Sequence, residues 1–190
     1  MRLFCTFMLL CFFNCPLNAQ GRSSEEALGE SLVTAIVADD VVAYSQCWIS
    51  SRRIVAMMTD IGIDLPADAP NEIRENYALR NKDIAESFRK IQSLIDSRKI
   101  DRQSIRLKEC VALSVRERKA PNGTIKKAGR FNLVLFVNGE EWRFDINDGF
   151  VDNGVWYFSD SPVNLFAGDT TLSFRDHRVK ANKSLNRSGE

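Results

Sequence analysis

The chain has 190 residues, 44% of them hydrophobic and 27% charged, and a formal net charge of +1. This length suits one domain with a substantial core. The near-neutral charge argues against a nucleic-acid or anionic-membrane surface, so we predict no nucleic-acid partner.

The first segment predicts export. Arg2 is the only charged residue before Arg22, and the run over 4–13 is short and almost wholly apolar. A polar break ending in Ala19 follows, which is the layout of a secretory signal peptide over 1–19. The run is about half of the ~20 apolar residues that a bilayer span needs, so we predict a secreted or periplasmic protein without a membrane span. A lipid anchor at Cys15 is the alternative, although the small residues that usually precede a lipidated cysteine are missing.

Cleavage after Ala19 would leave two cysteines, Cys47 and Cys110. Export would permit a disulfide between them. The strand pattern around Cys110 points it away from the core, so two separate thiols are the simpler expectation. These two cysteines and His177 are too few for a structural zinc site, and we predict no metal and no cofactor.

Helices are expected in the first half of the mature chain. Ser23 or Ser24 can cap the first helix, whose first turn holds two glutamates and whose apolar residues fall three or four apart. Asp39-Asp40 interrupts that pattern, and Gly62 and Pro66 end the third helix. Apolar spacing predicts helices over 25–38, 41–48, 52–60 and 82–97. Whether the polar stretch over 71–80 belongs to the last helix stays open.

The hydrophobic period changes to two at Ile105, which predicts a half-buried strand. On this parity Glu109 is the one carboxylate on the core side of the strand. The apolar residues of that side are Ile105, Leu107, Val111, Leu113 and Val115. A longer hairpin loop is expected over 120–123.

Two Asn-Gly pairs then predict tight hairpins, because both central positions of such a turn require a positive φ. Counting outward from Asn138-Gly139 gives one face with Val137–Glu140, Leu135–Trp142, Leu133–Phe144 and Phe131–Ile146. The other face then has Phe136–Glu141, Val134–Arg143 and Asn132–Asp145. Past Asn153-Gly154, Trp156 and Phe158 reach the core face only if a bulge at Asp148-Gly149 adds one residue. We predict an α+β fold with N-terminal helices packed on a curved four-stranded antiparallel meander.

The elements follow a definite order. A helix leads into Ala38-Asp39-Asp40-Val41-Val42-Ala43-Tyr44, further helices follow, and the meander ends in Gly154-Val155-Trp156-Tyr157-Phe158. This order resembles the nuclear transport factor 2-like superfamily. The resemblance covers about 25–160 and implies a cone, related to a cystatin-like α+β roll, often with an apolar pocket. It also implies either ketosteroid isomerase-like or cyclase-like chemistry, or a non-catalytic binding role. The segment over 64–80 departs from the shortest members, and would fill the pocket or roof it.

Candidate site residues are few. Glu109 beside Tyr44 would be a proton-transfer pair if the carboxyl were buried, while a solvated Glu109 would favour a binding module. An apolar ligand pocket, or simply the core, would be lined by Trp48, Met57, Met58, Trp142 and Trp156. Dimers in the superfamily often pair through the outer sheet face, which would present Ala112, Val134 and Phe136 among Arg116, Arg143 and Asp145.

We therefore expect one domain over 24–166 and a polar C-terminal tail over 167–190. The leading function is an exported, non-catalytic module that binds a small apolar ligand or a partner protein, with a homodimer as one form. The alternatives are an isomerase-type or cyclase-type enzyme with a pocket carboxylate, and an exported immunity or inhibitor protein.

Overall fold

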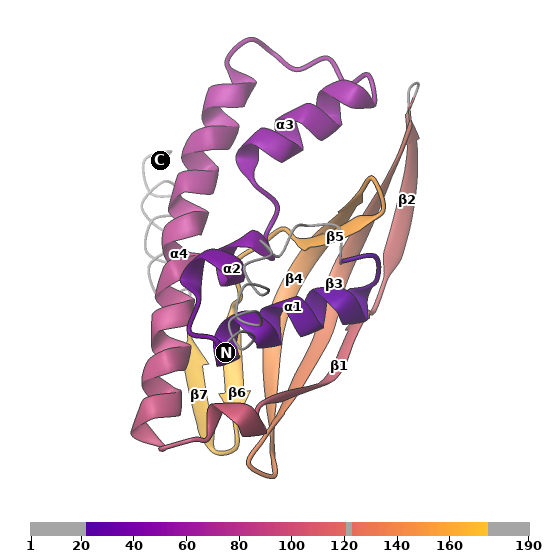
Figure 1. The fold of residues 1–190 in the computed structure, drawn as a ribbon. Coiled ribbons are helices and arrows are strands. Elements are labelled where there is room, and N and C mark those ends of the chain that lie inside the picture. The colour runs from indigo at the N-terminus through magenta and orange to yellow at the C-terminus, as the bar shows by residue number, and fades with distance from the viewer. Residues whose placement is uncertain (1–21, 121–122, 175–190) are drawn as a thin grey trace, which may run out of the picture.

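The computed structural model describes residues 22–120 and 123–174, so the predicted signal peptide and residues 175–190 lie outside the described part of the chain (Figure 1). The fold is α+β, as predicted: helices come first and an antiparallel sheet follows. The helices are α1 (Glu25–Val37), α2 (Val41–Gln46), α3 (Ser51–Asp60) and α4 (Ala69–Ser97).

Each of the first three helices begins at a residue whose side chain caps it. The Ser24 hydroxyl oxygen accepts a hydrogen bond from the backbone amide of Ala27 in α1, and the Asp40 carboxylate accepts hydrogen bonds from two backbone amides at the start of α2. Ser50 caps α3 in the same way. Such oxygens satisfy amides that have no partner within the helix, which fixes where it starts. The open question about 71–80 is resolved, since α4 is one helix of 29 residues.

Within residues 22–120 and 123–174 the sheet has seven strands, where four were predicted. Their order is β1-β3-β4-β6-β7, with β2 also beside β3 and β5 also beside β4. The strands are β1 (Arg106–Ala112), β2 (Val115–Ala120), β3 (Gly123–Val137), β4 (Glu140–Asp152), β5 (Val155–Phe158), β6 (Asn164–Ala167) and β7 (Thr170–Ser173).

The predicted domain end at 166 is too early, because the β6–β7 hairpin continues the sheet to Ser173. The next residue, Phe174, is buried in the main core. Gly168 makes the hairpin turn with a φ of 57°. The tail therefore begins later than the sequence pattern indicates.

The predicted register between β3 and β4 is confirmed in all seven pairs, from Phe131–Ile146 to Val137–Glu140. Asn138 and Gly139 have φ values of 48° and 87°, as the tight turn requires. Odd-numbered residues of β3 from Phe131 to Val137 thus face the helices and are buried.

The predicted parity of β1 is wrong beyond Leu107. The pairing with β3 shifts between Leu107 and Glu109, which leaves one extra residue, Lys108, in the strand. A bulge of this kind exchanges the two faces of the strand. As a result Cys110 enters the core, while Glu109 and Val111 point outward.

A second face exchange occurs near the predicted bulge at Asp148-Gly149. Asp148 has a φ of 55°, and neither Asp148 nor Gly129 opposite it is paired in the β3–β4 ladder. Each strand has one unpaired residue at this point, so the register between the strands is unchanged. The alternation of faces nevertheless shifts by one, because Ile146 and Gly149, three residues apart, are both buried. The extra residue is therefore on both strands rather than on β4 alone.

Two apolar clusters hold these layers together. In the main core, the inner face of the sheet packs against α1, α2 and α4, which lie on one side of it in Figure 1. The second cluster joins α3 and the first turns of α4 to β5 through Met57, Tyr77 and Tyr157. Since neighbouring strand residues point to opposite faces, Tyr157 faces away from Phe158 and the main core. From the segment over 64–80, Ile73 and Tyr77 pack against this second cluster and not against the main core.

Candidate functional site

The two predicted proton-transfer residues are not brought together. Tyr44 is fully buried in the main core, and its hydroxyl lies 3.1 Å from Ser87 Oγ. Burial raises the pKa of this phenol far above its ordinary range, so it stays protonated. Glu109 is exposed on the outer face of the sheet, where its carboxylate accepts a 2.8 Å hydrogen bond from Asn132 Nδ2.

The five predicted pocket residues are divided between the two clusters. Trp48 and Trp142 are buried in the main core with Trp156 packed at its edge, whereas Met57 and Met58 belong to the second cluster. The Trp48 ring lies 4.7 Å from that of Tyr44 and 5.4 Å from that of Phe158. These close ring contacts make Trp48 a packing residue.

The two cysteines in the described part of the chain, Cys47 and Cys110, are separate, free and buried. Burial raises the pKa of both thiols to about 12, so both stay neutral at physiological pH. The prediction that Cys110 points away from the core is wrong, because the bulge at Lys108 turns it inward.

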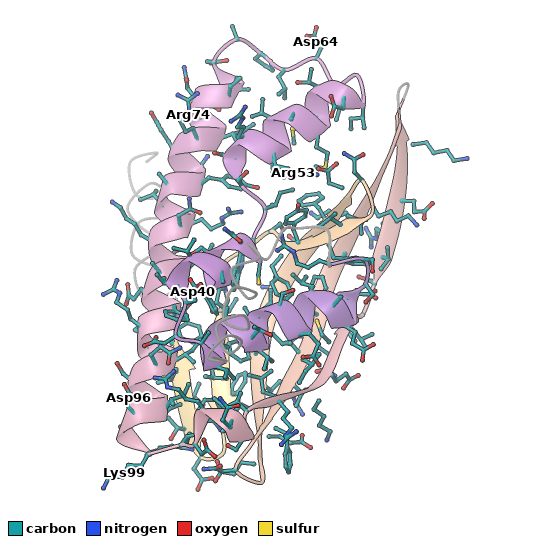
Figure 2. All side chains as sticks on the ribbon, viewed as in Figure 1. Asp40, Arg53, Asp64, Arg74, Asp96 and Lys99 are labelled. Atoms are coloured by element: carbon teal, nitrogen blue, oxygen red, sulfur yellow. The ribbon has the colours of Figure 1, made fainter. Side chains whose placement is uncertain are left out.

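Charged side chains tie the α3 end of the molecule to the sheet and to α4. Arg53, labelled in Figure 2, lies on the sheet side of α3 and pairs with Asp152 of β4 at 2.5 Å. Arg80 of α4 is buried and donates to the carbonyl oxygens of Ile49 and Ser159. Both arginines bridge structural elements, which is an architectural role.

The outer face of the sheet carries a group of exposed apolar side chains. Val134 of β3 is only 3% exposed, although it points away from the helices. On the same face of the sheet, Val111, Phe136 and Phe166 are exposed by 44%, 44% and 41%. We call these four residues the outer patch.

The predicted outer face is confirmed for Val134 and Phe136, but Ala112 lies on the inner side and packs against the core. Val111 takes its place because of the β1 bulge. Phe166 was missed, since β6 was not predicted. The Gly168-Asp169 pair directly after Leu165-Phe166-Ala167 is the signal that would have revealed it.

Charges of opposite sign flank the outer patch. Glu109 of β1 and Arg143 of β4 are the two neighbours of Val134 across the strands. In the next row Phe136 lies between Arg106 and Glu141. Glu141 forms an ion pair with Lys108, which lowers the pKa of its carboxyl.

Within the described ranges, no group of three or more histidine, cysteine or acidic side chains is placed to hold a metal ion. No described helix combines the length and the apolar character that crossing a bilayer demands. No family model, no curated protein and no solved structure matches this chain.

Proposed function

We propose that the protein is an exported, non-catalytic protein-interaction module that forms a homodimer through the outer face of its sheet. The observation that carries this proposal is the outer patch, in which two phenylalanines and a valine are exposed on the same face of the sheet as the buried Val134. Exposed aromatic side chains grouped on one face mark protein-binding surfaces more often than chance.

The charges around the patch favour a second copy as the occupant. In a face-to-face dimer with its two-fold axis along β3, each residue of β1 lies over one of β4 in the other copy. Glu109 then lies over Arg143 of the second copy, and Arg106 lies over Glu141. Phe136 and Val134, on the axis, meet their own counterparts. The face is therefore complementary to itself in charge.

The same positions weigh against the enzyme alternative. A general base must lie within hydrogen-bond reach of the proton it takes, in a site that excludes water. Glu109 is exposed on one side of the sheet and Tyr44 is buried on the other. A solvated Glu109 supports the binding module.

Membership of the nuclear transport factor 2-like superfamily is part of the proposal. Its support is the order of elements, helices first and then an antiparallel sheet, and the face exchange at Asp148, which is a device that curves a sheet into a cone. The proposal of export rests only on the signal-peptide pattern over 1–19. Mass spectrometry of the protein recovered outside the cytoplasm should give a chain that begins at Gln20, and an uncleaved chain would contradict it.

Sedimentation velocity with charge-exchange variants tests the dimer. Wild type is expected to sediment as a dimer, and Glu109→Arg or Arg143→Glu should each weaken association about tenfold or more by placing like charges together. The double variant exchanges the two charges and should restore association. A monomer at all concentrations, or no rescue in the double variant, would contradict this dimer. Lys99→Glu, far from the patch, is the matched control.

A further inference from the structure

A long strand edge lies on the side of the sheet away from β6 and β7. β1 is the last strand on this side, and β2 continues the same edge after a break at Leu113 and Ser114. Figure 1 shows no described element beyond β1 and β2. Together they run from Arg106 to Ala120 along β3.

Peptide groups of this edge point outward. Leu113 donates its amide to Arg130 of β3, and because a trans peptide directs its N–H and C=O in opposite directions, the carbonyl of Ala112 points away from the sheet. Ser114 accepts the amide of Gly129, so the N–H of Val115 points away as well. Alternation along β1 adds the N–H and C=O groups of Cys110. These groups can form a ladder with a further strand.

The side chains of the edge define the chemistry of that strand. Val111, Leu113 and Val115 are exposed by 44%, 60% and 45%, so apolar side chains are accessible along the edge, with Val111 on the outer face and Val115 opposite the buried Ala128 of the inner face. Five of the seven charged residues from Arg106 to Ala120 are basic. Arg116 and Lys119 are both exposed.

We propose that the β1–β2 edge binds an extended acidic segment of a partner protein, which adds to the sheet as a further strand. Its main chain pairs with the outward groups of Ala112 and Val115, and its apolar side chains cover Val111 and Leu113. Its carboxylates face Arg116, while Lys119 on the opposite face adds to the positive charge of the edge. A second copy of the chain does not suit this edge, since it would place one net-positive edge against another.

The test uses two synthetic peptides, one alternating glutamate with valine and one alternating lysine with valine. Each is titrated into the ¹⁵N-labelled mature protein while amide shifts and hydrogen exchange are followed. The glutamate peptide should bind, and should slow exchange at Cys110, Ala112 and Val115. The lysine peptide should bind about tenfold more weakly or not at all.

Two variants separate backbone pairing from charge. Val115→Pro removes only an N–H that points away from β3, so the fold is retained, and peptide affinity should fall about tenfold relative to Val115→Thr, which keeps the N–H and the shape. The double variant Arg116→Glu, Lys119→Glu should lose the preference for the glutamate peptide. These variants leave Glu109 and Arg143 unchanged, so this result and that of the dimer test are independent.

Three outcomes would overturn the proposal. The first is equal affinity for the two peptides. The second is indistinguishable binding by Val115→Pro and Val115→Thr. The third is protection of the edge amides without peptide that increases with protein concentration and is lost in Val115→Pro, which would assign the edge to a second copy.

Discussion

Helix α1 lies close to the sheet at Gly29, and Gly29→Ala measures how tightly the two layers pack there. Gly29 is buried in the middle of α1. A Cβ atom there would lie 2.6 Å from Cys110 Cβ and 2.9 Å from Leu107 Cδ1. Non-bonded carbon atoms pack at about 3.5–4.0 Å, so the new methyl group would force α1 off β1 by about 1 Å.

Two opposite effects decide the sign of the change. Alanine in a helix is about 1 kcal/mol more favourable than glycine, whereas overpacking a core costs about 1–3 kcal/mol. Both obstructing atoms belong to buried or half-buried strand residues held by the ladder with β3, so they yield little. We therefore expect an overpacking cost in the upper part of its range, which exceeds the gain from alanine in the helix. The free energy of unfolding should fall by about 1–2 kcal/mol.

Urea denaturation followed by tryptophan fluorescence is a suitable assay, since Trp48 and Trp142 report on the main core. Thr34→Ala is the matched control, because Thr34 lies on the exposed side of the same helix. It should be neutral or stabilising by a few tenths of a kcal/mol. Equal or greater stability of Gly29→Ala would refute the close approach of α1 to β1.

Three further changes probe the turn, the buried arginine and the thiols. Gly139→Val places a β-branched residue at a φ of 87° and should cost about 1–3 kcal/mol by urea denaturation, whereas Gly139→Asn should cost less. Arg80→Met leaves two buried carbonyl oxygens without their donor, so calorimetry should show a loss of about 2–4 kcal/mol, and a neutral result would contradict the bonds described. Burial raises the pKa of Cys47 and Cys110 from 9.0 to about 12, so the unfolded chain releases these protons first. Stability should therefore decrease as the pH rises from 9 towards 12, by up to about 1.4 kcal/mol per pH unit for each thiol, and Cys47→Ala should reduce this slope.

The register of β3 and β4 could be predicted because local chemistry determines it. Asn138 and Gly139 tolerate the positive φ of a tight turn, and the alternation on both sides then admits one pairing. The start of α1 could be predicted for the same reason, because Ser24, one of the two serines considered, caps it.

The candidate site depended on a feature with no local signal. Lys108 is an ordinary strand residue, and nothing in its local sequence marks the register shift beside it. That single shift moved Glu109 outward and Cys110 inward, which removed the predicted carboxylate from the interior. β6 and β7 are four residues each, too short for periodicity to show, and they gain stability by pairing, β6 with β4 and β7 with β6.

The second apolar cluster has a consequence for how the molecule unfolds. α3 contacts α4 and packs with Ile73, Tyr77 and Tyr157, but it takes no part in the main core. Regions with their own small cluster often open as cooperative units below the free energy of global unfolding. Native-state hydrogen exchange should therefore show α3 and the first turns of α4 opening together, at low denaturant, while α1 and β3 remain protected. A protease would accordingly cut α3 and the first turns of α4 first, and would leave the sheet and the remaining helices as the resistant fragment.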